Sequence, residues 1–243
     1  MQGQTLPVIV TRAEPGASET AARLGAFDVE VIVAPMLALE VDLECPIPDL
    51  GEISGLVFTS ANGVRVFANR TSDRSLTAWC VGPATAEAAR DSGFADVRES
   101  SGNAVDLALY IDHHAASSNR PLLHVANAAA KGDLKVQLEA LGRSVEFAPL
   151  YTMRPASALP EPVQHAIQSA SACLVLIHSA KGAARFASLC AEQSVSHLVA
   201  IAISEPASQP LLNLDLKAIH IASAPNEAKL LSALSAAIAT LSA

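Results

Sequence analysis

Residues 56–63 read Leu-Val-Phe-Thr-Ser-Ala-Asn-Gly, an apolar run that passes directly into small polar residues. An apolar run of this length predicts a strand that is buried on both faces, as in a parallel sheet. Serine and asparagine favour the start of a helix, because their side chains accept hydrogen bonds from its first N–H groups. The stretch therefore predicts a buried strand, a short loop and a helix, which is the unit of an α/β fold.

The same pattern returns in the second half of the chain. Residues 175–182 read Val-Leu-Ile-His-Ser-Ala-Lys-Gly, and the helices expected after the two stretches carry phenylalanine at the same place, Phe67 and Phe186. Residues 29–36 and 145–150 also match, since each ends a strand in Ala-Pro and an apolar residue. A period of about half the chain predicts two similar domains rather than a solenoid.

The rest of the chain continues this alternation of apolar runs and helical patterns. Strands are expected at residues 8–11, 78–81 and 95–98, and helices at residues 16–24, 83–91 and 103–112. Strands that alternate with helices predict parallel sheets covered by helices, so the expected fold class is α/β.

Composition excludes several classes of protein. The chain has 243 residues, of which 51% are apolar and 16% charged, enough to build a sizeable core. The formal charge is −8 and lysine and arginine form no run, so no nucleic-acid partner is expected. No stretch is long and apolar enough for a membrane span, and the start of the chain lacks the features of a signal peptide. We therefore expect a soluble, cytoplasmic protein with no membrane partner.

Motifs for cofactors and metals are missing. The chain has no Gly-x-x-x-x-Gly-Lys phosphate loop, no Gly-x-Gly-x-x-Gly dinucleotide motif and no Gly-x-Ser-x-Gly nucleophile turn. Its histidines do not combine with Cys, Asp or Glu at the spacing of a metal site. Its four cysteines are far apart and are expected to be free thiols. The sequence therefore predicts neither a cofactor nor a metal ion.

Four segments form a recognisable series along the chain. Residues 10–16 read Val-Thr-Arg-Ala-Glu-Pro-Gly, residues 58–64 read Phe-Thr-Ser-Ala-Asn-Gly-Val, and residues 81–86 read Val-Gly-Pro-Ala-Thr-Ala. Residues 141–151 run from a Leu-Gly pair into a strand that ends in a tyrosine. In this order, and over nearly the whole chain, the segments resemble the uroporphyrinogen-III synthase family.

The resemblance implies two flavodoxin-like parallel-sheet domains, joined by a two-stranded connector, with a substrate cleft between them. It implies a first domain of residues 1–36 and 151–243, and a second, inserted domain of residues 37–150. Proline-bearing stretches at residues 45–48 and 155–162 follow the two matching Ala-Pro strands, and such boundary elements permit this crossover.

The activity that the resemblance implies is that of a cyclising hydro-lyase. Hydroxymethylbilane would close to uroporphyrinogen III with inversion of ring D through a spiro intermediate, in haem, sirohaem and cobalamin biosynthesis. Closure without inversion needs no enzyme, so catalysis would rest on orientation and charge stabilisation. We expect a monomer without a cofactor, which takes its substrate from the enzyme that forms hydroxymethylbilane.

Loops after the expected strands supply the candidate substrate-binding residues, because strand ends and helix N-termini present free N–H groups. These residues are Thr11, Arg12, Ser60, Ala61, Asn62, Gly63, Gly82, Thr85, Ser179 and Lys181. The serines are equally expected as helix caps. Arg12 can bind a carboxylate through two N–H groups, or it can pair with Glu14 at the surface. Lys181 can hold a carboxylate or be solvated.

Tyr151 is the candidate catalytic residue. Its phenol can donate a proton or a hydrogen bond to the departing hydroxyl group. The matching position of the first repeat is Leu37, so the strand pattern does not demand a hydroxyl there. The alternative is a packing residue on the connector.

Two loops depart from the family pattern. Residues 126–128 read Ala-Asn-Ala where the family often has Arg-Gly, and residues 204–207 read Ser-Glu-Pro-Ala in place of a turn with glycine and threonine. These departures leave open a second hypothesis, a non-catalytic two-lobed ligand-binding module that has lost its activity. Ser60, Thr85 and Tyr151, in the expected order, favour the enzyme.

Overall fold

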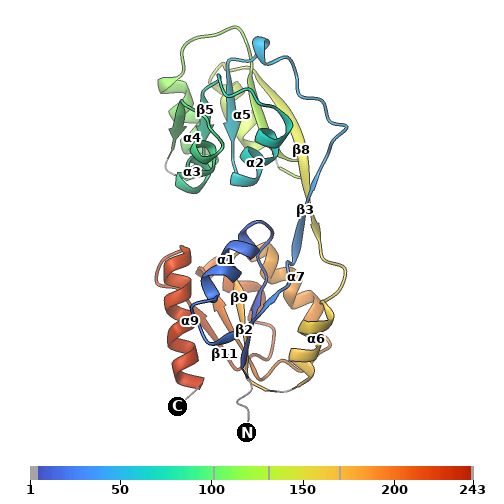
Figure 1. Ribbon diagram of the computed structural model, residues 1–243. Helices are drawn as coiled ribbons and strands as arrows, with labels where there is room; N and C mark the ends of the chain where they lie inside the picture. The colour runs from blue at the N-terminus through green and yellow to red at the C-terminus, as the bar shows by residue number, and fades with distance from the viewer. Residues whose placement is uncertain (1–4, 101, 131, 170, 242–243) are drawn as a thin grey trace. The chain divides into compact units, whose positions relative to one another are not determined.

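The computed structural model describes residues 5–100, 102–130, 132–169 and 171–241, and Figure 1 traces their course. The chain divides into two compact units. The first unit comprises Met1–Leu39 and Arg154–Ala243, and the second comprises Glu40–Met153. Each unit is built around its own sheet.

The first unit contains a parallel five-stranded sheet. Its strands are β1 (Leu6–Val10), β2 (Val29–Val33), β9 (Cys173–Ile177), β10 (Leu198–Ala202) and β11 (Ala218–Ile221). Their order is β11-β10-β9-β1-β2, and the four pairings between neighbours are all parallel. Read in chain order, this is the 2-1-3-4-5 arrangement of flavodoxin-like folds.

Helices cover both faces of this sheet, as Figure 1 shows. They are α1 (Gly16–Leu24), α6 (Glu161–Gln168), α7 (Ala180–Cys190), α8 (Glu205–Ser208), the 3-10 turn η2 (Gln209–Leu211) and α9 (Glu227–Leu241). Ile9 of β1 packs in a core with α6 and α7, whereas its neighbours Val8 and Val10 pack in a second core with α1 and α9. Both faces of β1 are therefore buried, which explains its unbroken apolar sequence.

The second unit contains a six-stranded sheet of order β3-β8-β7-β4-β5-β6. Its strands are β3 (Leu37–Val41), β4 (Gly55–Phe58), β5 (Ala78–Cys80), β6 (Val97–Glu99), β7 (Leu122–Asn127) and β8 (Val145–Pro155). The pairings from β8 to β6 are all parallel. Its helices are η1 (Leu50–Glu52), α2 (Ala61–Arg70), α3 (Pro83–Asp91), α4 (Ala104–His114) and α5 (Asp133–Ala140).

The core of the second unit also lies on both faces of its sheet. Val57 of β4 packs in a cluster that includes residues of α4 and α5. Phe58, the next residue, makes edge contacts with Phe67 of α2 and with Phe94, at ring-centroid distances of 5.9 Å each. Alternate residues of the stretch that predicts the fold therefore enter opposite layers.

The internal repeat occupies equivalent places in the two sheets. The order β2-β1-β9-β10-β11 of the first unit corresponds to β8-β7-β4-β5-β6 of the second. The stretches at residues 56–63 and 175–182 thus include the ends of β4 and β9, which hold the same central position, while residues 29–36 and 145–150 include β2 and β8, which lie beside β1 and β7. The strand end expected at Ala148-Pro149, and the one expected at Tyr151, are wrong, because β8 continues to Pro155. The predicted α/β class with two parallel sheets is confirmed.

Strands β3 and β8 carry the chain from one unit to the other and are neighbours in the sheet. The second unit begins within β3, and the first unit resumes within β8. Because the second unit is inserted in this way, its sheet has the flavodoxin-like arrangement in permuted chain order.

Gly63 is fixed by packing. A Cβ at this position would lie 2.9 Å from the carbonyl oxygen of Val125, so α2 can approach β7 only because the residue is glycine. At Gly182, the matching position of the first unit, the nearest atom to such a Cβ is the Ser179 hydroxyl oxygen at 3.1 Å.

The substitution Gly63→Ala is therefore expected to destabilise the second unit by about 1–3 kcal/mol, because backbone atoms must move to admit the methyl group. Trp79, the one tryptophan of the chain, is buried in this unit, so its fluorescence reports urea unfolding there. Gly182→Ala, followed by circular dichroism, is the matched control with a smaller expected loss. A Gly63→Ala midpoint at or above that of the wild type would contradict the packing argument.

Candidate active site

The first unit gathers its candidate residues where β1 and β9 end side by side. The strand order reverses between these two strands, and in such sheets the loops on either side diverge and leave room for a ligand. Thr11 follows β1 and is only 3% exposed. Its hydroxyl donates a 2.6 Å hydrogen bond to the carbonyl oxygen of Leu176 in β9. The Thr11 side chain therefore joins the two strand ends, and its proton is not free for a ligand.

Arg12 lies at the same edge but has a different partner from the one considered in the sequence. Its Nη1 lies 3.4 Å from Oε2 of Glu227, the first residue of α9. The Glu14 carboxylate instead accepts hydrogen bonds from the backbone N–H and the hydroxyl of Ser18, at 3.0 and 2.9 Å. Pairing of Arg12 with Glu14 is thus wrong, because Glu14 is used in the first turn of α1.

Glu227 is held by three side chains from separate segments. Its Oε1 accepts a 2.7 Å hydrogen bond from the Thr20 hydroxyl, and its Oε2 lies 3.3 Å from Nε2 of His178 as well as close to Arg12. Burial raises the pKa of Glu227, but the contacts with His178, Thr20 and Arg12 outweigh burial and lower this pKa to about 2. Glu227 is therefore a carboxylate at neutral pH.

Ser179 and Lys181 occupy the start of α7. The Ser179 hydroxyl accepts a 3.1 Å hydrogen bond from the backbone N–H of Gly182, so this serine does cap the helix. Its O–H proton is not used in that bond and can still be donated to a ligand. Lys181 is exposed in the first turn.

In the second unit, Tyr151 and Ser60 come together at the equivalent edge. Ser60 caps α2 by accepting a 3.1 Å hydrogen bond from the backbone N–H of Asn62. Tyr151 lies on β8, is 3% exposed, and makes hydrogen bonds with the Ser60 side chain and the Asn127 backbone. Burial raises the pKa of Tyr151 more than these hydrogen bonds lower it. The phenol therefore keeps its proton at neutral pH.

Neighbouring side chains complete this edge of the second unit. Thr59 Oγ1 lies 3.3 Å from Nε2 of His124, a buried residue of β7. Burial lowers the pKa of His124 to about 4, so its ring is neutral at physiological pH. The Asn62 amide nitrogen lies 3.9 Å from the sulfur of Met153. The amide and the hydroxyls thus supply donors without charge.

The third loop of candidates lies between β5 and α3. The carbonyl oxygen of Gly82 accepts hydrogen bonds from the backbone N–H groups of Thr85 and Ala86, at 3.1 and 3.0 Å. Thr85 is 5% exposed. Gly82 has an extended backbone with φ of 178°, which any residue can adopt. Ala61 opens α2 and is partly buried.

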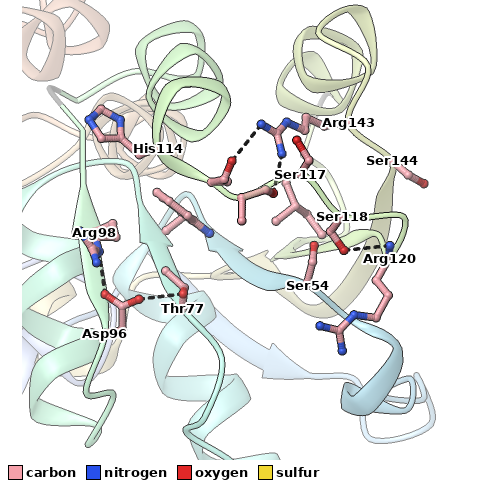
Figure 2. A pocket seen from close by; sticks show the side chains of 14 residues that line it. Ser54, Thr77, Asp96, Arg98, His114, Ser117, Ser118, Arg120, Arg143 and Ser144 are labelled. Atoms are coloured by element: carbon pink, nitrogen blue, oxygen red, sulfur yellow. Dashed lines mark hydrogen bonds and ion pairs between the residues drawn. The ribbon is translucent and has the colours of Figure 1, made fainter.

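A polar cavity lies at the other end of the second sheet (Figure 2). It has a volume of about 290 Å³ and is lined by residues that precede or begin the strands, such as Ser54, Thr77 and Asp96. Its arginines have partners within the protein: Arg98 pairs with Asp96, and Arg143 donates to three backbone carbonyl groups. We therefore do not assign this cavity to the candidate site.

The sequence prediction missed several residues of these two edges. They are Thr20, His124 and Glu227. Glu227 follows Asn226 at a helix start, which was the signal that could have indicated it. Among the described residues, no group of three or more His, Cys, Asp and Glu side chains could hold a metal ion. Nor is any helix in the described ranges long and apolar enough to cross a membrane.

The fold and these two edges define a protein of two flavodoxin-like α/β units with hydrogen-bond donors at the carboxyl ends of both sheets. A family model described as Uroporphyrinogen-III synthase HemD matches residues 18–232. The chain belongs to the uroporphyrinogen-III synthase HemD family.

Solved structures support the fold. The chain is similar to uroporphyrinogen-III synthetase from Helicobacter pylori 26695, with a TM-score of 0.65, 15% identity, and coverage of 96% of this chain and 99% of that one. It is also similar to a mutant uroporphyrinogen III synthase from the extremely thermophilic bacterium Thermus thermophilus, with a TM-score of 0.56, 14% identity, and coverage of 98% and 99%. No curated protein sequence matches the chain.

The environment of Glu227 predicts a pH-dependent contribution to stability. Its pKa of about 2 lies below the ordinary value of 4.5, so its charge stabilises the fold above about pH 4.5, and this stabilisation is lost as the pH falls toward 2. With solvent screening of a partly exposed group, we expect Glu227→Gln to cost about 2 kcal/mol at pH 7.

Urea unfolding of the wild type and of Glu227→Gln at a series of pH values between 7 and 3 measures this difference. The two stabilities should approach each other below about pH 4.5. Glu192→Gln, at an exposed position that precedes β10, is the matched control. A difference that stays constant over this range would show that the charge of Glu227 is not what stabilises the fold.

Proposed function

We propose that this chain is a uroporphyrinogen-III synthase, a lyase that converts hydroxymethylbilane to uroporphyrinogen III with inversion of ring D. Membership in the family supports this activity. The observation that carries the proposal is the contact of the Tyr151 hydroxyl with Ser60 and with the backbone of Asn127 at the carboxyl edge of the second sheet. This contact holds a protonated phenol at an edge that is rich in uncharged donors.

The first chemical step requires help for a poor leaving group. The bond between the hydroxymethyl carbon and its oxygen breaks, and the hydroxyl departs as water when it receives a proton. Tyr151 supplies that proton or a hydrogen bond, because its raised pKa keeps the phenol protonated. The nitrogen of the electron-rich pyrrole donates into the carbon that has lost the bonding pair, and the product is an azafulvene cation.

The following steps rearrange carbon–carbon bonds. The substituted carbon of ring D attacks the cation and forms the spiro intermediate, which then fragments and closes again with ring D inverted. Loss of one proton restores the aromatic pyrrole. Since simple closure gives the uninverted isomer without an enzyme, the protein needs chiefly to hold the chain in the shape that favours spiro attack.

The substrate carries many carboxylates, and the carboxyl-edge loops provide donors for them. In the first turns of α2, α3 and α7, the backbone N–H groups of residues 61, 63, 84, 180 and 181 are not used by the helix caps, and such groups favour anions. Side-chain donors are added by Arg12, Ser60, Asn62, Thr85, Ser179 and Lys181, while Thr11, Ala61, Gly63 and Gly82 shape the loops. All of these steps proceed without a metal ion or an organic cofactor.

The setting of this reaction follows from its class. As a member of the family, the enzyme acts in tetrapyrrole biosynthesis. We place it in the cytoplasm as a monomer that receives unstable hydroxymethylbilane from the enzyme that forms it.

A non-catalytic ligand-binding module is the competing function. It is favoured by the loop at residues 204–207, where Ser204 makes no side-chain cap and the helix that follows is only 4 residues long. The Tyr151 contact is not required by simple binding, so the enzyme remains the better-supported proposal.

An isomer assay tests the activity. Purified, metal-stripped protein is given fresh hydroxymethylbilane, and the oxidised porphyrin isomers are separated. The wild type should give mostly the type III isomer. Type I isomer alone, formed at the spontaneous rate by a folded protein, would contradict the proposal and support the binding module.

The same assay tests the role of Tyr151. Tyr151→Phe should lower kcat by about 10- to 100-fold without abolishing type III formation, because the hydroxyl assists departure while the fold still orients the substrate. Tyr110→Phe removes the hydroxyl of the other tyrosine in the chain and should leave kcat unchanged. An unchanged kcat in Tyr151→Phe would show that the phenol packs and does not transfer a proton.

A further inference from the structure

Glu227 connects three segments that the chain keeps far apart in sequence. Thr20 lies in α1, His178 follows β9, and Glu227 opens α9. One carboxylate oxygen accepts the Thr20 hydrogen bond at 2.7 Å, and the other lies within 3.4 Å of both the His178 ring and the Arg12 guanidinium. Three side chains of the first unit thus converge on one carboxylate.

These four side chains differ in how far they are exposed to solvent. Thr20 is fully buried, and the side chains of His178, Glu227 and Arg12 are 7%, 15% and 37% exposed. Arg12 is therefore the outermost member of the cluster. Thr20 and His178 fix the Glu227 carboxylate from the buried side. Glu227 can therefore fix Arg12, which is the most exposed of these four side chains.

The inner side of the cluster is built for a fixed negative charge. Both ring nitrogens of His178 are buried, and its Nε2 lies 3.3 Å from Oε2 of Glu227. The ring therefore holds the carboxylate from the buried side of the cluster.

Arg12 keeps most of its donors available. Its contact with Glu227 uses Nη1, and among the described residues no other hydrogen bond from Arg12 is found. A guanidinium has five N–H groups, so a second, bidentate contact with an incoming carboxylate remains open. Nε, Cζ and Cδ of Arg12 lie against Gly16, where a Cβ would collide with them.

We propose that Glu227 is a positioning residue that fixes the Arg12 guanidinium at the end of β1, ready to bind a carboxylate of the substrate. This inference rests on the proposed function, because that substrate carries the carboxylates. A long side chain that is already ordered loses less entropy on binding, which favours affinity for the ligand without changing the chemical step.

An opposing effect must be separated from positioning. The charge of Glu227 also repels an anionic substrate, so removal of the charge alone would strengthen binding. Glu227→Ala removes both the charge and the contact, whereas Glu227→Gln removes the charge but keeps an acceptor of the same shape. Positioning predicts that the alanine variant is the more harmful of the two.

The test is steady-state kinetics with hydroxymethylbilane. Glu227→Ala should raise KM at least fivefold with kcat within twofold, and Glu227→Gln should raise KM less. In an Arg12→Ala background, Glu227→Ala should have no further effect on KM, because there is no guanidinium left to position. Glu192→Ala removes a carboxylate before β10, at the other end of the sheet, and should leave KM unchanged. A lowered or unchanged KM in Glu227→Ala would overturn the proposal. So would an equal rise in KM when Glu227→Ala is added to Arg12→Ala.

A second measurement is independent of activity. The Arg12 Nε–H signal in a ¹⁵N-labelled protein should show restricted motion in the wild type and increased motion in Glu227→Ala, with Glu227→Gln in between. If the alanine variant does not fold, the glutamine variant supplies this comparison. If the wild type makes no type III isomer, the proposed function is wrong. If Arg12 moves equally in the wild type and in the Glu227 variants, the positioning role of Glu227 is wrong.

Discussion

Two buried strand pairings, β1 with β9 and β7 with β4, determine where everything functional in this protein can lie. At each pairing the order of the sheet reverses, so the loops that follow the two strands leave in opposite directions. The Thr11 hydroxyl bridges the first pairing at 2.6 Å, and Gly63 allows α2 to pack directly on β7 beside the second. A change in either pairing would displace the candidate residues together.

The two units place different side chains on the same scaffold. Each has a strand followed by a serine that caps the next helix. In the second unit, Ser60 meets the buried phenol of Tyr151, and the surroundings are neutral hydroxyl, amide and imidazole groups. The first unit has the Arg12–Glu227 pair at its edge instead. An internal repeat can thus keep a fold while its two copies present different side chains.

The fold could be predicted because its signals are local. The apolar run of residues 56–59 is buried on both faces of β4, and a strand of this kind has few alternatives. The strand expected at residues 95–98 begins later, at Val97, because Asp96 turns to hydrogen-bond Thr77 and Arg98. The division of the chain within β3 and β8 depends on long-range pairing, which periodicity does not encode.

The candidate site was less predictable for the same physical reason. Ser60 and Ser179 are visible as helix starts, but the partner of Arg12 is 215 positions away and could not be chosen over the adjacent Glu14. Gly63 was expected to contact substrate, and its closeness to the Val125 carbonyl supplies a packing reason that no local pattern reveals. Hydrogen bonds and ion pairs between distant segments are decided by the fold as a whole.

Hydrogen–deuterium exchange tests most directly whether the carboxyl edges bind the substrate. Exchange would be compared with and without the product uroporphyrinogen III under nitrogen. First-turn amides have no helical partner and exchange quickly unless a ligand accepts their hydrogen bonds. We expect slowed exchange at residues 61, 63, 84, 180 and 181, because Pro83 has no amide hydrogen and those of Asn62, Thr85 and Gly182 already bond within the chain. Slowed exchange around the opposite cavity, at residues 114–120, with none at these helix starts would contradict it.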